Sequence, residues 1–273
     1  MMGVTGRWSP TNTFLSGTTA TMFSTNGTYD GEQFWNTDYK ALYVWTTNRW
    51  DCVYVDDRYG TILKDEFVGY STGSQMGWSG VSSGNMGNSQ DRQGVLYVEP
   101  STAATRAYLN SYAAGMCFGT HDLFLSSVLK LPVLATGAQD FCASFGFNDN
   151  SVYDANGACT DGACILINRA VNGANIICTT TSNGTATTTN TSTLITADTW
   201  FRPRVWVSAL NSNVKFYLGE TLLATHTTNI PSGVARQTCI QWKMDKTVGN
   251  SAVDMFIDKF KCDIFSNGVA AAA

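Results

Sequence analysis

The chain has 273 residues and a net charge of −4, with 14% charged, 44% hydrophobic and 12% aromatic residues. This length allows one large domain with a small appendage. No basic run and no apolar run of membrane-spanning length is present, so we expect no nucleic-acid binding and no membrane insertion. The first residues lack the apolar stretch of a secretion signal, which predicts a protein made and assembled in a cytosol. The low charge suggests that other protein covers much of the surface.

Residues 1–60 are dense in aromatic and turn residues and are predicted to form a separate N-terminal β-meander. Within it, residues 30–54 predict three short strands, with turns at 36–38 and 47–48. So small a sheet cannot be stable alone, so its aromatic rings need a partner. The rest of the chain, sister chains and a larger assembly all remain open. The candidate contact residues are Phe34, Trp35, Tyr39, Tyr43, Trp45 and Trp50.

The larger domain is predicted to span residues 61–273, after a joint at 56–60. The run 123–131 alternates less cleanly than the others and is compatible with a helix, but Pro132 and β-branched neighbours favour a strand. Residues 140–147 predict a strong strand. The stretch 163–178 predicts a hairpin.

Two threonine-rich strands are expected over residues 179–196, on the solvent side of a sheet, because Asn183 and Gly184 form a hairpin turn signal. From Trp200 onward, short connections join strands at 200–208, 213–218 and 221–226. Gly219 stands at the first central position of a II′ turn. Such tight connections require antiparallel neighbours, so the second half predicts an antiparallel β-sandwich.

The stretch DGEQFWNTDYKALYVWTTNRW resembles a small β-motif found near the N-termini of tailed-phage virion proteins, such as tail fibres, tailspikes and head fibres. In that family the motif attaches or trimerises the chain. The resemblance implies a homotrimer that contacts phage capsid or tail proteins in a virion assembled in the host cytoplasm. The matching residues are Gly31, Trp35, Asn36, Thr37, Asp38, Leu42, Tyr43, Val44, Trp45, Asn48 and Trp50.

From Asp65 onward the order of segments resembles the concanavalin A-like (laminin G-like) jelly roll. The segments are FVGYSTGSQMGWS, GVLYVEPST, FCASFGF, ITADTWFRPRVWV, VKFYLGETLLATHTTNIPSG and AVDMFIDKFKC. The resemblance covers about three quarters of the chain and implies an all-β fold, an antiparallel β-sandwich. That fold hosts both sugar-binding modules and glycoside hydrolases, so it does not decide the function.

No residue pattern for catalysis stands out, and we predict a non-enzymatic protein without a cofactor. A glycoside hydrolase needs two carboxylates across the scissile bond, and the four glutamates, Glu32, Glu66, Glu99 and Glu220, are not suitably paired. Asp254 and Asp258 fall on one face of a strand, which makes them a weak catalytic pair. The two histidines, His121 and His226, do not indicate a serine hydrolase, because the sequence has no Gly-x-Ser-x-Gly elbow for a nucleophilic serine.

Metal and disulfide sites are equally weakly indicated. Asp149, Asp154, Asn156 and Asp161 gather oxygen ligands in one loop, as a weak calcium candidate that does not match an EF-hand. Most of the eight cysteines lie in apolar runs, which favours buried thiols. Cys159 and Cys164 form the best local pair for a disulfide.

Two functions remain. The first is a structural protein of a bacteriophage virion, either a capsid decoration (cement) protein or a fibre, with host-surface glycan binding as a secondary property. The alternative is a lectin-like carbohydrate-binding module for receptor recognition, in which Trp78 or Trp242 stacks on a sugar.

Overall fold

The structure is a computed structural model, and it describes part of the chain. The described residues are 15–17, 21–22, 32–37, 41–46, 49–55, 60–65, 79–80, 84–88, 94–111, 116–119, 121–149, 159–167, 175–208, 212–232 and 237–266.

Two compact units make up the chain, Met1–Thr61 and Ile62–Ala273. The first contains a four-stranded sheet in the order β1-β2-β3-β4. The three strands predicted between residues 30 and 54 are present as antiparallel neighbours. A further short strand, β1, pairs parallel to β2 and was not predicted. The bounds are β1 Leu15–Gly17, β2 Gln33–Asn36, β3 Ala41–Thr46 and β4 Arg49–Val55.

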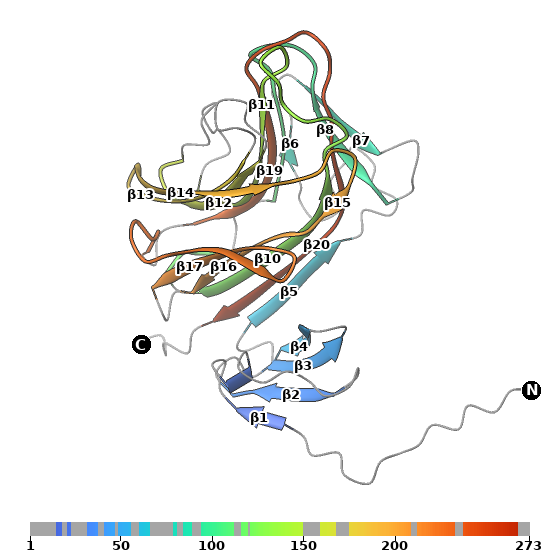
Figure 1. The fold of residues 1–273 in the computed structure, drawn as a ribbon. Helices are drawn as coiled ribbons and strands as arrows, with labels where there is room; N and C mark the ends of the chain where they lie inside the picture. The colour runs from blue at the N-terminus through green and yellow to red at the C-terminus, as the bar shows by residue number, and fades with distance from the viewer. Residues whose placement is uncertain are drawn as a thin grey trace, which may run out of the picture. The chain divides into compact units, whose positions relative to one another are not determined.

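The second unit is built from two large sheets (Figure 1). The nine-stranded sheet has the order β18-β17-β16-β10-β20-β8-β7, with β15 beside β10 and β5 beside β20. Its strands are β5 Gly60–Asp65, β7 Gly84–Asn88, β8 Leu96–Pro100, β10 His121–Lys130, β15 Trp200–Phe201, β16 Pro203–Ser208, β17 Asn213–Leu218, β18 Thr221–His226 and β20 Met255–Ser266.

The seven-stranded sheet has the order β14-β13-β12-β11-β19-β9-β6. Chain neighbours β19 and β20 belong to different sheets, a crossover that the sequence did not reveal. The strands are β6 Ser79–Gly80, β9 Arg106–Asn110, β11 Phe141–Asn148, β12 Gly162–Ile167, β13 Asn175–Ser182, β14 Thr185–Leu194 and β19 Cys239–Lys246.

Local turn chemistry explains the tightest hairpins. Gly219 has a φ of +57° in the two-residue connection between β17 and β18, as the first position of a II′ turn requires. Asn183 and Gly184 both have positive φ, at +50° and +75°, which suits a I′ turn between β13 and β14. Both predicted hairpins are confirmed.

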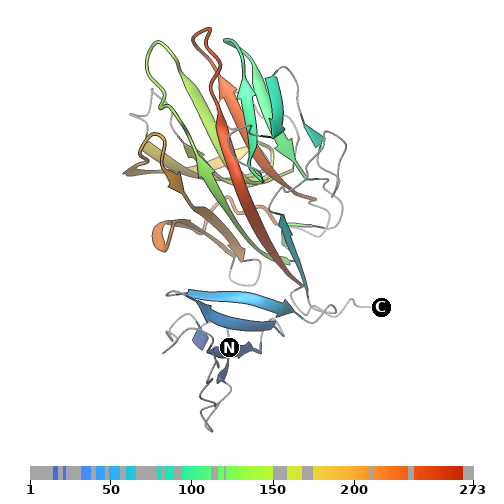
Figure 2. The ribbon, with the colours of Figure 1, turned by 90° about the vertical axis from the view of Figure 1, so that its right-hand side faces the viewer.

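The hydrophobic core lies between the two large sheets. One inner face contributes Leu125 and Val205, and the other contributes Phe145 and Trp242, all at most 1% exposed. The longest pairing joins β10 to β20, seen as a green and a red strand side by side in Figure 2. Because β10 is a strand throughout, the helical alternative for residues 123–131 is wrong.

The fold is therefore all-β, an antiparallel sandwich, as predicted. Beyond strands, the described residues include a helical pair, Thr21 and Met22. Within the described ranges, no helix has the length and apolar character needed to cross a bilayer.

Candidate functional site

The seven-stranded sheet carries polar side chains on its outer face, the face turned away from the nine-stranded sheet. In β19, Ile240, Trp242 and Met244 belong to the core. Because successive side chains of a strand point to opposite faces, the residues between them lie on the outer face. Gln241 and Lys243 are nevertheless only 1% exposed. Hydrogen-bonding and charged groups are thus buried away from the main core.

Five residues in register form one line across this face, which we call the polar row. Asn110 of β9 lies opposite Gln241 of β19, which lies opposite Gly146 of β11. Gly146 in turn pairs with Cys164 of β12, and Cys164 with Thr179 of β13. With strands ~4.8 Å apart, the row is about 19 Å long.

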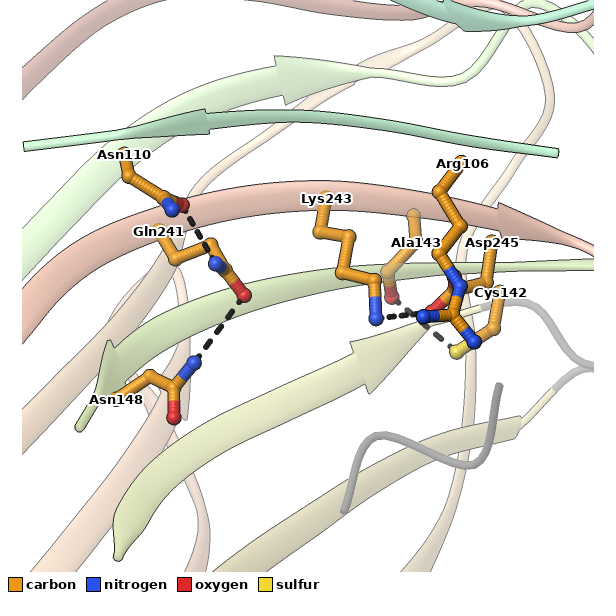
Figure 3. Close-up of polar contacts among 8 residues, drawn as sticks. All are labelled: Arg106, Asn110, Cys142, Ala143, Asn148, Gln241, Lys243 and Asp245. Carbon is orange, nitrogen blue, oxygen red and sulfur yellow. Dashed lines mark hydrogen bonds and ion pairs between the residues drawn. The ribbon is translucent and has the colours of Figure 1, made fainter. Parts of the chain in front are cut away.

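The amides at one end of the polar row are hydrogen-bonded to one another (Figure 3). Gln241 Nε2 donates to Asn110 Oδ1 at 2.5 Å, and Asn148 Nδ2 donates to Gln241 Oε1 at 3.5 Å. Among the residues that the structure describes, two buried groups of the row have no hydrogen-bond partner, Asn110 Nδ2 at one end and Thr179 Oγ1 at the other. Such groups are costly unless something pairs with them.

Gly146 leaves the middle of the polar row without a side chain. Its φ is +155°, and a Cβ built there would lie 2.3 Å from the carbonyl oxygen of Ala163 on the neighbouring strand. A larger residue would therefore force β11 and β12 apart. The row consequently consists of hydrogen-bonding groups on both sides of a bare stretch of backbone.

A charged group lies next to the amides on the same face (Figure 3). Asp245 binds Lys243 Nζ through Oδ2 at 2.5 Å and Arg106 Nε through Oδ1 at 3.1 Å. Burial lowers the pKa of Lys243, and the carboxylate of Asp245 opposes that shift. Asp245 thus holds two cations in place at the edge of the polar row.

Trp242, predicted to stack on a sugar, is not on this face. It is 0% exposed, donates from Nε1 to Ser127 Oγ at 3.1 Å and packs against Phe145 and Phe260. The prediction is wrong because Trp242 shares the inner face of β19 with the core residues. The other candidate, Trp78, lies outside the described residues.

The aromatic residues proposed as subunit contacts are partly described. Phe34, Tyr43 and Trp45 are 2%, 6% and 8% exposed, and Trp35 is half-buried. Tyr39 and the side chain of Trp50 lie outside the described residues. Their role in contacts with other subunits stays a prediction.

The calcium candidates are only partly described, because Asp154 and Asn156 lie outside the described ranges. Asp161 accepts a hydrogen bond at its Oδ1 from the backbone N–H of Asn183 at 3.0 Å, and its carbonyl accepts from Asp149 N–H at 2.9 Å. Among described residues, no three His, Cys, Asp or Glu side chains gather as metal ligands would. Asp161 acts here as a cap for the β13–β14 turn.

His226 lies in a second buried network, which we call the histidine clasp, at the edge where β18 of one sheet approaches β13 and β14 of the other. Its ring is 3% exposed and contacts Thr180 Oγ1 through Nδ1 at 3.0 Å and Thr189 Oγ1 through Nε2 at 2.9 Å. The Thr180 hydroxyl also donates to the carbonyl of Thr228 at 3.2 Å. His121, by contrast, contacts the backbone of Cys117.

Asp254 pairs with Glu99 rather than with Asp258, its predicted partner. The side chains of Asp254 and Glu99 are hydrogen-bonded, and Asn85 Nδ2 donates to Glu99 Oε1 at 2.8 Å. Burial, followed by the charge of Glu99, raises the pKa of Asp254 to about 6. This pair belongs to the nine-stranded sheet and its flank, away from the polar row.

The cysteines whose side chains the structure describes are thiols, as the sequence predicted. They are Cys117, Cys142, Cys159, Cys164, Cys178, Cys239 and Cys262.

Comparison with known proteins adds a family and a fold. A family model described as SO2946-like, C-terminal domain, matches residues 91–258. A search of curated proteins finds no match to the sequence. Among solved structures, SO2946 from Shewanella oneidensis MR-1, a protein of unknown function, has 18% identity and a TM-score of 0.53, covering 79% of this chain and 90% of that one.

Sugar-binding and sugar-cleaving proteins share the fold. Winged bean acidic lectin, solved with methyl-α-D-galactose, has 7% identity and a TM-score of 0.56, covering 76% of this chain and 99% of the lectin. A Bacteroides ovatus mixed-linkage glucan GH16 enzyme, solved with its G4G4G3G product, has 13% identity and a TM-score of 0.51, covering 73% and 99%. At these identities the likeness shows the concanavalin A-like fold alone.

Proposed function

The chain belongs to the SO2946-like family through its C-terminal domain, and we propose that it binds carbohydrate on the outer face of its seven-stranded sheet. The observation that carries this proposal is the polar row, at whose two ends the buried Asn110 Nδ2 and Thr179 Oγ1 have no hydrogen-bond partner among the described residues.

Sugar hydroxyls both donate and accept hydrogen bonds, so they suit a buried row that offers both kinds of group. The Asn110 amide provides a donor, and the Thr179 hydroxyl provides a donor and an acceptor. Gly146 between them lets strands β11 and β12 approach each other closely. The length of the row, about 19 Å, suits an extended chain of sugars better than a single ring. The lectin and glucanase structures of the same fold support carbohydrate as the ligand class.

We infer a binding module rather than a hydrolase because the carboxylates are wrongly placed. Glycoside hydrolysis uses two carboxyl groups roughly 5–9.5 Å apart on either side of the scissile bond. On the described strands β9, β11, β12, β13 and β19, the outer face carries one carboxylate, Asp245, and it is tied to Lys243 and Arg106. The Glu99–Asp254 pair belongs to the other sheet, and its carboxyl groups are in hydrogen-bonding contact.

The test is a glycan array on the purified chain, followed by calorimetry with the oligosaccharide that binds best. Gln241→Met removes the central amide at similar volume, and we expect it to weaken binding at least about tenfold, the equivalent of one lost hydrogen bond of ~1.4 kcal/mol. Thr187→Val is the matched control and should bind normally, because the Thr187 hydroxyl on β14 bonds Thr228 Oγ1 at 2.8 Å beside the histidine clasp and is not part of the polar row. An array without a binder at millimolar ligand, or equal affinity for both variants, would contradict the proposal.

A second candidate is a structural subunit of a bacteriophage particle, which docks or trimerises through the meander. The motif of residues 30–50 favours it, whereas the lectin and the glucanase described above are not virion proteins. Light scattering on the full chain tests it, since a homotrimer is expected and a monodisperse monomer that does not associate with particles would count against it. The two candidates are compatible, because a virion surface protein can bind host glycans.

A further inference from the structure

Two cysteines meet at one end of the same outer face. Cys159 and Cys164 form a small buried cluster apart from the main core, with exposures of 7% and 1%. The two side chains are hydrogen-bonded to each other. Cys164 belongs to the polar row, whereas Cys159 lies in the segment that leads into β12.

The sheet offers a fitted place for the Cys159 sulfur. A Cβ built on Gly162 would lie 2.3 Å from Cys159 Sγ, so the sulfur occupies space that any other residue at position 162 would fill. Gly162 and Cys164 are two apart on β12 and therefore share a face. Thr181 lies opposite Gly162 in register. Cys159 thus packs between Gly162, Cys164 and Thr181.

Backbone contacts hold the segment around Cys159 in position. Gly184 N–H donates to the carbonyl of Thr160 at 2.8 Å, and Asp149 N–H donates to that of Asp161 at 2.9 Å. The Asp161 carboxylate also accepts from Asn183 N–H. Three hydrogen bonds therefore fix the two residues after Cys159 to the ends of β11 and β13. The segment is thereby held with Cys159 beside Cys164.

We propose that Cys159 and Cys164 are a redox-active pair that a small-molecule disulfide, such as oxidised glutathione, converts into an intramolecular disulfide. The Cys159 thiolate attacks one sulfur of oxidised glutathione and releases the first glutathione thiolate. Cys164, as the thiolate, then attacks the Cys159 sulfur and releases the second. Two thiols lose two electrons, oxidised glutathione gains them, and two protons leave the cysteines.

The environment predicts how this reaction proceeds. The hydrogen bond with Cys164, together with burial, raises the pKa of the Cys159 thiol, so little thiolate exists at neutral pH. Oxidation should therefore be slow and should accelerate as the pH rises. The product closes a short loop that contains Thr160, Asp161, Gly162 and Ala163, next to the polar row.

The experiment uses the full chain incubated with oxidised glutathione at mildly alkaline pH. Remaining thiols are alkylated, and the chain is cut before aspartates without reductant. Cleavage between Thr160 and Asp161 separates peptide 154–160, which holds Cys159, from peptide 161–197, which holds Cys164 and Cys178. We expect one linked species, two mass units lighter than the sum of the two peptides, that reductant splits.

Three variants assign the bond. Cys164→Ser should abolish the linked species, whereas Cys178→Ser should keep it, because Cys178 faces the main core. Cys239→Ser is the matched control, a buried thiol on the same face that should change nothing. Separate peptides in the wild-type chain, or a linked species that survives Cys164→Ser, would overturn the proposal.

Discussion

The polar row with its charged neighbours and the histidine clasp are both buried networks, but they differ in how charge is compensated. Next to the row, the buried Lys243 and the half-buried Arg106 share one carboxylate, that of Asp245. In the clasp, one ionisable ring is surrounded by hydroxyl groups. The first network can stay charged inside the protein, whereas the second stays neutral.

The strands around the clasp explain that neutrality. Strand β14 contains no ionisable side chain, and the one ionisable group of β13 is Cys178, whose pKa burial raises to about 12. On β17, Phe216 packs against the His226 ring at 5.1 Å, while Lys215 and Tyr217 point to the opposite face. No charge on these strands therefore faces the ring to stabilise an imidazolium. The charge state of the Asp245 network should therefore change little around neutral pH, whereas that of a lone histidine changes.

The largest effect is expected from removing the shared carboxylate. Asp245→Ala takes away the partner of both Lys243 and Arg106, and breaking a buried pair costs roughly 3–5 kcal/mol of unfolding free energy. Urea denaturation at neutral pH measures this loss. The matched control is Asp198→Ala, which breaks the exposed pair with Lys130 at 2.7 Å and should cost less than ~1 kcal/mol. If both variants lose the same unfolding free energy, the pairing of Asp245 with Lys243 and Arg106 is not a major source of stability.

The two networks also differ in how far the sequence reveals them. The hairpins after Trp200 and at Asn183–Gly184 were predictable because the turn residues and the alternation are local signals. The outer face of the seven-stranded sheet was not predictable, because β11, β12 and β19 are buried on both faces. Alternation shows which residues share a face, but not which face meets the core.

The wrong prediction that Trp242 stacks on a sugar follows from this uncertainty about which face of β19 meets the core. One usable signal was present, since Gln241, Lys243 and Asp245 alternate with Ile240, Trp242 and Met244 in β19. That pattern assigns the apolar set, Trp242 included, to the core. The polar row itself depends on the register of five strands that come from residues 106 to 246, and no local pattern encodes such long-range pairing.

A medium effect is expected from acid on the histidine clasp. Burial lowers the pKa of His226 below its usual 6.5, so the unfolded chain takes up the proton first as the pH falls. The contribution of the neutral ring is therefore fully present above pH ~6.5. At lower pH this contribution to the unfolding free energy decreases, by up to ~1.4 kcal/mol per pH unit, until the folded state is protonated too. Urea midpoints between about pH 7.5 and 5 measure the decline.

His226→Gln should remove this decline, because glutamine can bond the same threonines without titrating. At pH ~7.5 the variant should lose only about 1 kcal/mol. His121→Gln is the control and should keep the decline. A decline that persists in His226→Gln would assign the acid sensitivity to another group.

The smallest effect concerns Asp254. Its contribution to stability changes with pH in the opposite direction to that of His226, so it separates the two kinds of buried group. Its pKa of about 6 lies above the unfolded value of 3.8, so the folded state favours the protonated carboxyl. The group therefore contributes stability below pH ~4 and loses it as the pH rises through about 6. Asp254→Asn keeps a hydrogen-bond donor for Glu99 at every pH. It should raise the unfolding free energy by about 1 kcal/mol at pH ~7.5, a value discounted for the partial exposure of the pair, and by nothing near pH 4. Asp258→Asn, on β20, serves as the control. If Asp254→Asn raises the unfolding free energy equally at every pH, protonation of Asp254 is not the cause of the gain.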